Sequence, residues 1–246
     1  MPKLSVNVNK VATLRNTRAL DIPSLIHVSR LALDAGAHGI TVHPRPDQRH
    51  VRPADVYALA ELLRGRYPHA EFNIEGNPFF DYVHFAREVR PTQCTLVPDS
   101  PDARTSDHGW DLSRPDPRLA DVIAELKGYG CRVSLFMDPK PEQIRLAAKL
   151  GVDRVELYTE PYAAAFASGN PEAVSPCTAA ARAAAEVGLG VNAGHDLNLA
   201  NLPPFVAGVP NLLEVSIGHA LIADALEFGM APTVRKYLAA CGVTSR

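Results

Sequence analysis

The 246-residue sequence lacks an excess of either charge, because 25 Lys and Arg residues stand against 27 Asp and Glu residues. A net charge of −2 provides no field that would hold nucleic acid or an anionic membrane by bulk attraction. No apolar run reaches the roughly 18 residues of a membrane span, and the start of the chain lacks an apolar signal region. We therefore expect a cytoplasmic protein without a nucleic-acid or membrane partner.

Cysteine is also scarce and scattered. Cys94, Cys131, Cys177 and Cys241 show no C-x-x-C spacing and are too few for a disulfide scaffold, so we expect reduced, mostly buried thiols. The His and acidic residues form no H-E-x-x-H motif, and we predict no metal site. Ligation by residues from distant strands remains the alternative. Schiff-base catalysis would need a lysine at a strand end, where only Lys10 is well placed.

One weak repeat is present along the chain. An Ala- or Leu-rich helix end is followed by a glycine and then a β-branched strand, with the glycines at Gly36, Gly130, Gly151 and Gly188. Glycine after a helix adopts the left-handed conformation that ends the helix. Strands that alternate with helices of 10 to 15 residues predict a parallel sheet.

Eight strands are expected, and their runs read as apolar on both faces, which is typical of strands covered by helices. Their predicted ranges are 4–9, 39–43, 71–75, 93–97, 131–137, 153–158, 189–193 and 213–217. We predict a single (β/α)8 TIM barrel over residues 1–246, with additional short helices. An open doubly wound sheet is the alternative, but no G-x-G-x-x-G follows the first strand.

Titratable residues follow several of these strands. His43, Glu75, His195 and His219 stand at or just after the carboxyl ends of strands two, three, seven and eight. In a barrel these ends share one face, so we expect one acid–base site there. The alternative for any single histidine is a surface or helix-capping role.

Cations are dense in the loops after the first two strands, where Arg15, Arg18, Arg45, Arg49 and His50 occur. Guanidinium groups bind phosphate through paired hydrogen bonds, so a phosphorylated or carboxylated substrate is expected. Solvated or acid-paired arginines are the alternative.

Two further loops belong to the same face. Gly194 and Gly218, with a helix start after each, predict a second anion-binding region. Segment 98–117 is either a lid over the site or a solvated loop.

At these residues the sequence resembles the pyridoxine 5′-phosphate synthase family over nearly its whole length. The resemblance rests on Val11-Ala-Thr-Leu-Arg-Asn16, Gly39-Ile-Thr-Val-His43, Arg49-His50, Cys94-Thr-Leu-Val-Pro98, Val133-Ser-Leu-Phe136, Val191-Asn-Ala-Gly-His195 and Ile217-Gly-His219-Ala. It implies a TIM-barrel transferase, usually a homo-octamer. The implied reaction condenses 1-deoxy-D-xylulose 5-phosphate with 3-amino-2-oxopropyl phosphate, releases phosphate and water, and needs neither metal nor redox cofactor.

The resemblance also implies roles for individual residues. His43 and Glu75 match proton acceptors, and His195 matches a proton donor. The matched or neighbouring substrate contacts are Asn7, Asn9, Lys10, Arg18, Arg45, His50, Thr105, Glu156, Gly218 and His219.

Three departures from the family pattern stand out. Asn9-Lys10 replaces a common Asp-His, Asp196 replaces a common Gly, and Gly76-Asn-Pro78 follows Glu75 in place of an apolar continuation. These departures leave a phosphosugar isomerase or aldolase as an alternative. A non-catalytic sensor of phosphorylated ligands is a further alternative, although it would leave Glu75, His43 and His195 without a role.

Overall fold

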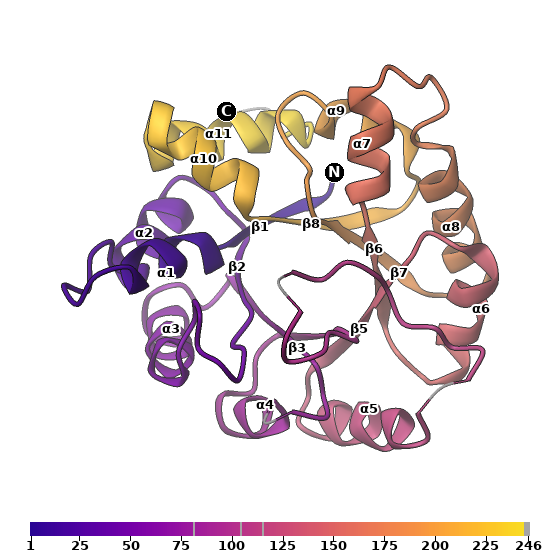
Figure 1. Ribbon diagram of the computed structural model, residues 1–246, viewed down its shortest axis with the longest axis horizontal. Helices are drawn as coiled ribbons and strands as arrows, with labels where there is room; N and C mark the ends of the chain where they lie inside the picture. Colours follow the sequence, from indigo (N-terminus) through magenta and orange to yellow (C-terminus); the bar gives the residue numbers. More distant parts are fainter. Residues whose placement is uncertain (81, 104, 115, 244–246) are drawn as a thin grey trace.

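The computed structural model describes residues 1–80, 82–103, 105–114 and 116–243. Eight parallel strands pair in chain order, and β8 pairs with β1 to close a barrel (Figure 1). The strands are β1 (Lys3–Asn7), β2 (Gly39–Val42), β3 (Glu71–Gly76), β4 (Gln93–Leu96), β5 (Arg132–Met137), β6 (Arg154–Tyr158), β7 (Gly190–Gly194) and β8 (Leu212–Ile217). The predicted TIM barrel is confirmed.

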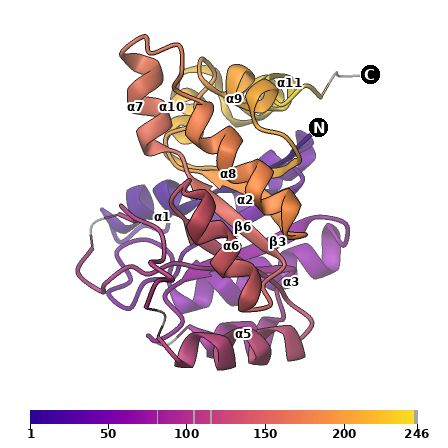
Figure 2. The same cartoon turned by 90° about the vertical axis from the view of Figure 1, so that its right-hand side faces the viewer.

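Eleven helices in the described part of the chain surround the barrel (Figure 2). They are α1 (Asn9–Asn16), α2 (Leu25–Asp34), α3 (Pro53–Arg66), α4 (Val83–Val89), α5 (Arg118–Gly128), α6 (Pro141–Lys149), α7 (Glu160–Ala167), α8 (Ser175–Glu186), α9 (Leu202–Gly208), α10 (His219–Phe228) and α11 (Met230–Ala240). Among the described residues, no helix is long and apolar enough to cross a membrane.

Glycine ends the helices as the repeat predicted. Gly36, Gly130, Gly151 and Gly188 all have positive φ, from 75° to 104°, just before β2, β5, β6 and β7. These strands therefore start where the sequence placed them, to within one residue. The first strand is shorter than expected, because helix α1 already begins at Asn9.

The outer face of the strands forms the main hydrophobic core. Leu4, Val6, Ile40, Ile74 and Leu135 are fully buried against the helices. Alternation along a strand sends every second side chain to this face and the others into the barrel.

The inside of the barrel is polar, and the expectation of strands apolar on both faces was wrong. Hydrogen bonds join Ser5 to Thr41 (2.6 Å) and Thr95 to Asn73 (3.0 Å) across buried strand positions. Arg132 of β5 contacts Glu214 of β8, strands that are not neighbours, so these side chains meet through the interior. The strands are only four to six residues long, so the alternation of apolar and polar side chains is hard to recognise in the sequence. The polar positions include Ser, Thr and Asn, which can be buried when they are hydrogen-bonded.

The amino-terminal end of the barrel is closed by an ion-pair network. Glu71 pairs with Lys3 and Arg132, while Glu214 lies 3.5 Å from both Arg132 and Arg154. This arrangement leaves the opposite, carboxyl end of the strands as the face where loops and polar side chains can form a site.

Candidate active site

Three strand ends converge on Glu75. Its Oε2 accepts a hydrogen bond from Asn7 Nδ2 (3.4 Å) and lies 3.8 Å from His43 Nδ1. Asn7 ends β1, His43 follows β2 directly, and Glu75 lies on β3, so neighbouring strands bring them together. The structure brings together the carboxylate and the imidazole that the sequence predicted at neighbouring strand ends.

Burial makes Glu75 an unusual carboxyl group. Desolvation, with the charges of Asp99 and Glu214 adding to it, raises the pKa of Glu75 to about 8. Its side chain is therefore largely protonated at pH 7 and is poised to exchange a proton near neutrality.

The nearby histidines are shifted in the opposite direction. Burial lowers the pKa of His43 well below its usual value, and the charges of Arg45 and His50 lower it further. Burial also lowers the pKa of His50 to about 4, with the charges of Arg45 and Lys10 acting in the same direction. Both rings are thus neutral at pH 7, and a neutral His43 can accept a proton.

Asn9 and Lys10 occupy different positions relative to this group. Asn9 Oδ1 accepts a hydrogen bond from the backbone N–H of His43 (2.9 Å), while Asn7 Oδ1 accepts one from the Asn9 N–H (3.0 Å). Asn9 therefore holds the start of the loop that carries His43. Lys10 is exposed, close enough for its charge to act on His50.

His195 lies across the mouth against an aromatic wall. Its ring centroid is 4.9 Å from that of Phe136 and 5.5 Å from that of Tyr158. Phe136, Tyr158 and Val97 form an apolar cluster separate from the main core. Burial lowers the pKa of His195, and the charge of Asp196 partly opposes this.

The backbone after β7 is strained. His195 (φ 79°) and Asp196 (φ 55°) both adopt the left-handed region, which non-glycine residues rarely occupy. Such strain is often retained at functional sites. The Asp196 side chain is exposed.

Glu156 lies inside the barrel, below the mouth. Its side chain is 1% exposed, and Thr95 Oγ1 donates to its Oε2 at 3.5 Å. Burial raises the pKa of Glu156, and the charges of Glu75 and Glu214 raise it further. A Cβ at Gly194 would lie 2.5 Å from Glu156 Oε1, so glycine is needed there for this close approach.

Arg45 connects two of the loops. It is buried, donates to the backbone oxygen of Ala103 (3.0 Å) and pairs with Asp99, which also accepts a hydrogen bond from Ser106 Oγ (2.6 Å). These contacts hold part of the connection between β4 and α5 against the loop after β2, and Figure 1 shows that connection in magenta in front of the strands.

Sequence reasoning missed Asp99. The residue is 3% exposed, and its charge acts on both Glu75 and His195. The available signal was its place directly after the fourth predicted strand and Pro98, the same kind of position that singled out His43 and His195.

Two predicted cations serve the scaffold. Arg15 is buried in α1, and its guanidinium donates to Asp55 at 2.5 and 2.9 Å and to the backbone oxygen of His50 at 3.2 Å. Arg49 pairs with Asp47 and donates to the backbone oxygen of Ala103. The acid-paired alternative therefore holds for Arg15 and Arg49, and also for Arg45. Arg15 orients the loop that carries His50.

The two glycine-containing ends differ. Gly218 directly precedes α10, which starts at His219, so backbone N–H groups at this helix start face the carboxyl end of β8. Helix α9 begins only at Leu202, seven residues after His195, so the expected helix start directly after β7 was wrong. Gly218 lies against Asn7, since an added Cβ would be 3.2 Å from Asn7 Cβ.

Arg18 and Thr105 are not gathered with the others. Both are exposed, and within the described residues neither side chain forms a hydrogen bond or an ion pair with a predicted site residue. His219 is exposed as well, at the edge of the mouth.

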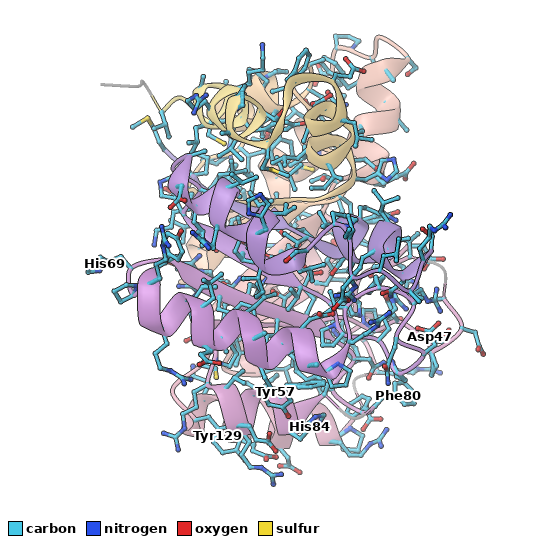
Figure 3. All side chains as sticks on the ribbon, turned by 90° about the vertical axis from the view of Figure 1, so that its left-hand side faces the viewer. Asp47, Tyr57, His69, Phe80, His84 and Tyr129 are labelled. Carbon is cyan, nitrogen blue, oxygen red and sulfur yellow. The ribbon has the colours of Figure 1, made fainter. Side chains whose placement is uncertain are left out.

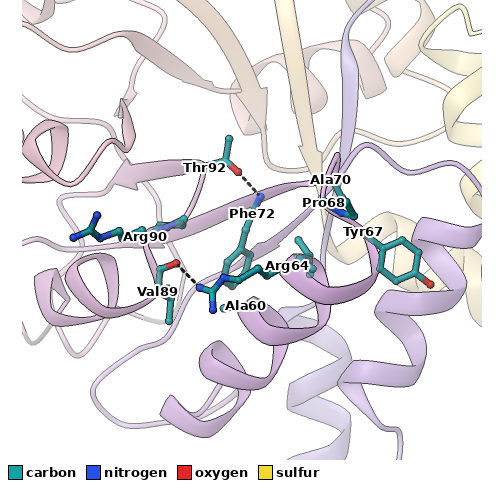
Figure 4. Close-up of a pocket in the computed structure, with 11 residues that line it drawn as sticks. Ala60, Arg64, Tyr67, Pro68, Ala70, Phe72, Val89, Arg90 and Thr92 are labelled. Carbon is teal, nitrogen blue, oxygen red and sulfur yellow. Dashed lines mark hydrogen bonds between the residues drawn. The ribbon is translucent and has the colours of Figure 1, made fainter.

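A cavity also lies near the amino-terminal end of the barrel strands, away from the candidate active site. It has a volume of about 310 Å³, and Arg64, Phe72, Arg90 and Thr92 are among its lining residues (Figure 4). Figure 3 shows the same separation of ends, with Asp47 and Phe80 on one side of the molecule and His69 on the other. Over the described ranges, no group of three or more His, Cys, Asp or Glu residues is arranged to hold a metal ion.

Solved structures confirm the class of fold. Thiamine phosphate pyrophosphorylase from Pyrococcus furiosus superposes with a TM-score of 0.62 at 12% identity, covering 98% of this chain and 95% of that one. A tryptophan synthase structure from M. tuberculosis gives 0.64 at 14% identity, covering 99% and 94%. At these identities the likeness concerns the fold alone.

Sequence comparison identifies the family. The family model described as "Pyridoxal phosphate biosynthesis protein PdxJ" matches residues 4–242. Pyridoxine 5′-phosphate synthase from Chelativorans sp. (strain BNC1) is 53% identical over 243 residues, covering 97% of this chain and 98% of the relative. The enzyme of that name from Xanthomonas campestris pv. campestris (strain B100) is 54% identical over 244 residues, covering 96% and 94%.

A (β/α)8 barrel enzyme with an acid–base group at its mouth is therefore the class that fold and site define. The chain belongs to the PdxJ family and functions as a pyridoxine 5′-phosphate synthase in vitamin B6 biosynthesis. Its substrates are phosphorylated small molecules.

Proposed function

We propose that this chain condenses 1-deoxy-D-xylulose 5-phosphate with 3-amino-2-oxopropyl phosphate at the carboxyl end of the barrel and releases phosphate and water. The observation that carries the proposal is the contact of Glu75 with His43 and Asn7, where a carboxyl of raised pKa meets a neutral imidazole. Loss of water from a hydroxyl needs one proton delivered and another removed, which this pair is suited to do.

Within this proposal, His43 accepts a proton and His195 donates one. Glu75 accepts a proton in its ionised form, which is the minor fraction at pH 7 because its pKa is about 8. His195 is held by Phe136 and Tyr158 beside the mouth, opposite the strands that carry His43 and Glu75. Its proton would assist departure of the phosphate leaving oxygen. Burial raises the pKa of Glu156, and its protonated form would donate a hydrogen bond to oxygen atoms that gain negative charge.

The two phosphates bind at two cationic or N–H-rich places. Arg45 and His50 border one of them, and the family resemblance assigns Thr105 to it as well. Asn7, Gly218 and His219 border the other, at the start of α10. Holding both substrates by their phosphates supplies the orientation that a two-substrate condensation requires.

Asn9 and Lys10 have different roles in this proposal. The Asn9 side chain positions His43 by accepting a hydrogen bond from the His43 backbone N–H. In this proposal the Asn9 Nδ2 contacts substrate. Lys10 supplies the anion or carbonyl contact that an imidazole makes in the common family pattern. Unchanged Michaelis constants for both substrates in Lys10→Ala would contradict this assignment.

Arg18 lies outside the mouth of its own barrel, in the connection between α1 and α2. Leu20 (63% exposed) and Ile22 (70% exposed) lie in the same connection, and such exposed apolar side chains are typical of contact surfaces. We propose a homo-oligomer, an octamer by resemblance, in which this connection contacts a second copy and Arg18 reaches a phosphate there. The absence of a nucleic-acid or membrane partner, the lack of a required cofactor and a cytoplasmic location are part of the same proposal.

The test is a reaction with both substrates and no added metal. Purified protein is incubated with 1-deoxy-D-xylulose 5-phosphate and 3-amino-2-oxopropyl phosphate. The amounts of pyridoxine 5′-phosphate and inorganic phosphate formed are then measured together. Equal, protein-dependent release of the two products supports the proposal. The absence of product from a folded preparation would contradict it.

A further inference from the structure

Asp99 is a buried carboxylate whose two oxygens have different surroundings. Its Oδ2 pairs with Arg45 and accepts a hydrogen bond from Ser106 Oγ (2.6 Å). Its Oδ1 is equally buried, but within the described residues it has no hydrogen-bond partner. A buried acceptor left without a donor destabilises the folded state, so its retention needs a reason.

Asp99 lies close to the residues proposed to act in the reaction. It borders a small cavity together with His43, Arg45 and Tyr82. Its charge also acts on Glu75 and on His195, which approach from the opposite sides of the mouth. A ligand that contacts His43 can therefore reach Asp99 as well.

The side chain is fixed in this position. Asn77 Nδ2 donates to the Asp99 backbone oxygen (3.0 Å), and Arg45 and Ser106 hold the carboxylate from the other side. Because both the backbone and Oδ2 are held, Oδ1 is an acceptor with a fixed location. Fixed acceptors discriminate between donors better than mobile ones, since no ordering is needed on binding.

We propose that Asp99 Oδ1 accepts a hydrogen bond from the amino group of the amino-ketone phosphate substrate and makes Asp99 a specificity-determining residue. The inference rests on the proposed function for the identity of that substrate. An ammonium group gives a charge-assisted hydrogen bond to a carboxylate, which is stronger than the bond from a neutral hydroxyl. The site thereby distinguishes the amino ketone from dihydroxyacetone phosphate, which has a hydroxyl at the same position.

The experiment measures binding without turnover. Calorimetry gives dissociation constants of the whole protein for 3-amino-2-oxopropyl phosphate and for dihydroxyacetone phosphate, each alone. Asp99→Asn is the test variant, because an amide oxygen can still accept from Arg45 and Ser106 while the amide nitrogen replaces Oδ1 with a donor. Ser106→Ala is the matched control, because it removes a contact to Oδ2 only.

The wild-type protein is expected to bind the amine about tenfold more tightly than the hydroxyl analogue, as a charge-assisted hydrogen bond implies. Asp99→Asn should abolish this preference, and Ser106→Ala should retain it within about threefold. A purely structural role for Asp99, through Arg45, would weaken both ligands equally and leave their ratio unchanged, and that result would overturn the inference.

Two further outcomes are decisive. If Asp99→Asn does not fold, the test is the ratio of the two dissociation constants measured on the wild-type protein. Equal affinity for the amine and the hydroxyl analogue would then overturn the inference. Failure of the proposed function is seen separately, as a lack of pyridoxine 5′-phosphate from wild-type protein with both substrates, because the binding ratio does not depend on turnover.

Discussion

Glu75 illustrates how position decides the chemistry of a residue. The same carboxyl on a surface would be ionised at pH 7, but burial beside Asp99 raises its pKa to about 8. Contact with Asn7 and His43 holds this carboxyl at the carboxyl end of the barrel, where we propose that substrate binds. The residue is thus suited to proton exchange at the expense of stability.

That cost predicts a pH-dependent effect of Glu75→Gln on folding. In the unfolded chain Glu75 loses its proton near its usual value of 4.5, whereas the folded protein keeps it up to about pH 8. The folded state therefore binds more protons between these values, and its free energy of unfolding falls as the pH rises. Removing the group should eliminate this loss, which amounts to at most about 1.4 kcal/mol per pH unit.

Urea unfolding of wild type and Glu75→Gln at pH 5, 6.5 and 8 checks this prediction. The variant should gain stability relative to wild type at each step toward pH 8. The exposed Glu160→Gln is the control and should follow wild type throughout. Parallel curves for wild type and Glu75→Gln would show that Glu75 titrates as an exposed carboxyl does.

At the residue scale, sequence reasoning succeeded where a strand end fixed the position. His43, Glu75 and His195 were expected at the barrel mouth because each ends a strand, and no long-range contact was needed to place them. Asp99 escaped notice because its importance comes from burial and from pairing with Arg45, neither of which has a local pattern. Thr105, taken from resemblance alone, stays a prediction, and so does Arg18, which was taken from the cation-rich loop after the first strand and from resemblance.

At the scale of elements, the sequence predicted the strands closely because glycine marked where helices end. Gly188 has a φ of 77° between α8 and β7. The face of each strand was harder to assign. The contacts across the interior, such as the one between Arg132 and Glu214, show that polar side chains point into the barrel and pair with one another there. These contacts join residues that are far apart in the sequence.

Gly188→Ala isolates the conformational requirement at one helix end. No atom lies within 4 Å of an added Cβ, so the cost comes from the left-handed backbone alone, about 1 to 2 kcal/mol. Gly65→Ala, within helix α3, also meets no neighbour but has no positive φ, and should stabilise by up to about 1 kcal/mol. Thermal and urea unfolding measure both changes, and the same sign in both variants would contradict the explanation.

At the scale of the whole molecule, one barrel contains the acid–base group but leaves Arg18 outside it. The α1–α2 connection projects from the left of the barrel in Figure 1. A second copy that covers Leu20 and Ile22 would bury their apolar surface. The same contact would bring the Arg18 guanidinium to the barrel mouth of that second copy. Sequence reasoning could not locate this surface, because exposure is a property of the folded molecule.

Leu20→Glu tests this contact. A charge at a side chain that is 63% exposed should leave the barrel folded but split the assembly into smaller species, with weaker substrate binding. Phe166→Glu is the control, since this side chain is 36% exposed on α7, away from α2 (Figure 1). Light scattering on both variants gives the masses, and an unchanged mass for Leu20→Glu would rule out this surface as the contact.

The most direct measurement of the central claim, that Glu75 performs proton transfer in ring closure, compares turnover with binding in Glu75→Gln. The amide keeps the shape of the carboxyl but cannot exchange its proton, so both substrates should bind with dissociation constants near those of wild type. Formation of pyridoxine 5′-phosphate should fall by a factor of about 100 or more. Turnover close to that of wild type in a variant with intact binding would contradict the assignment of Glu75.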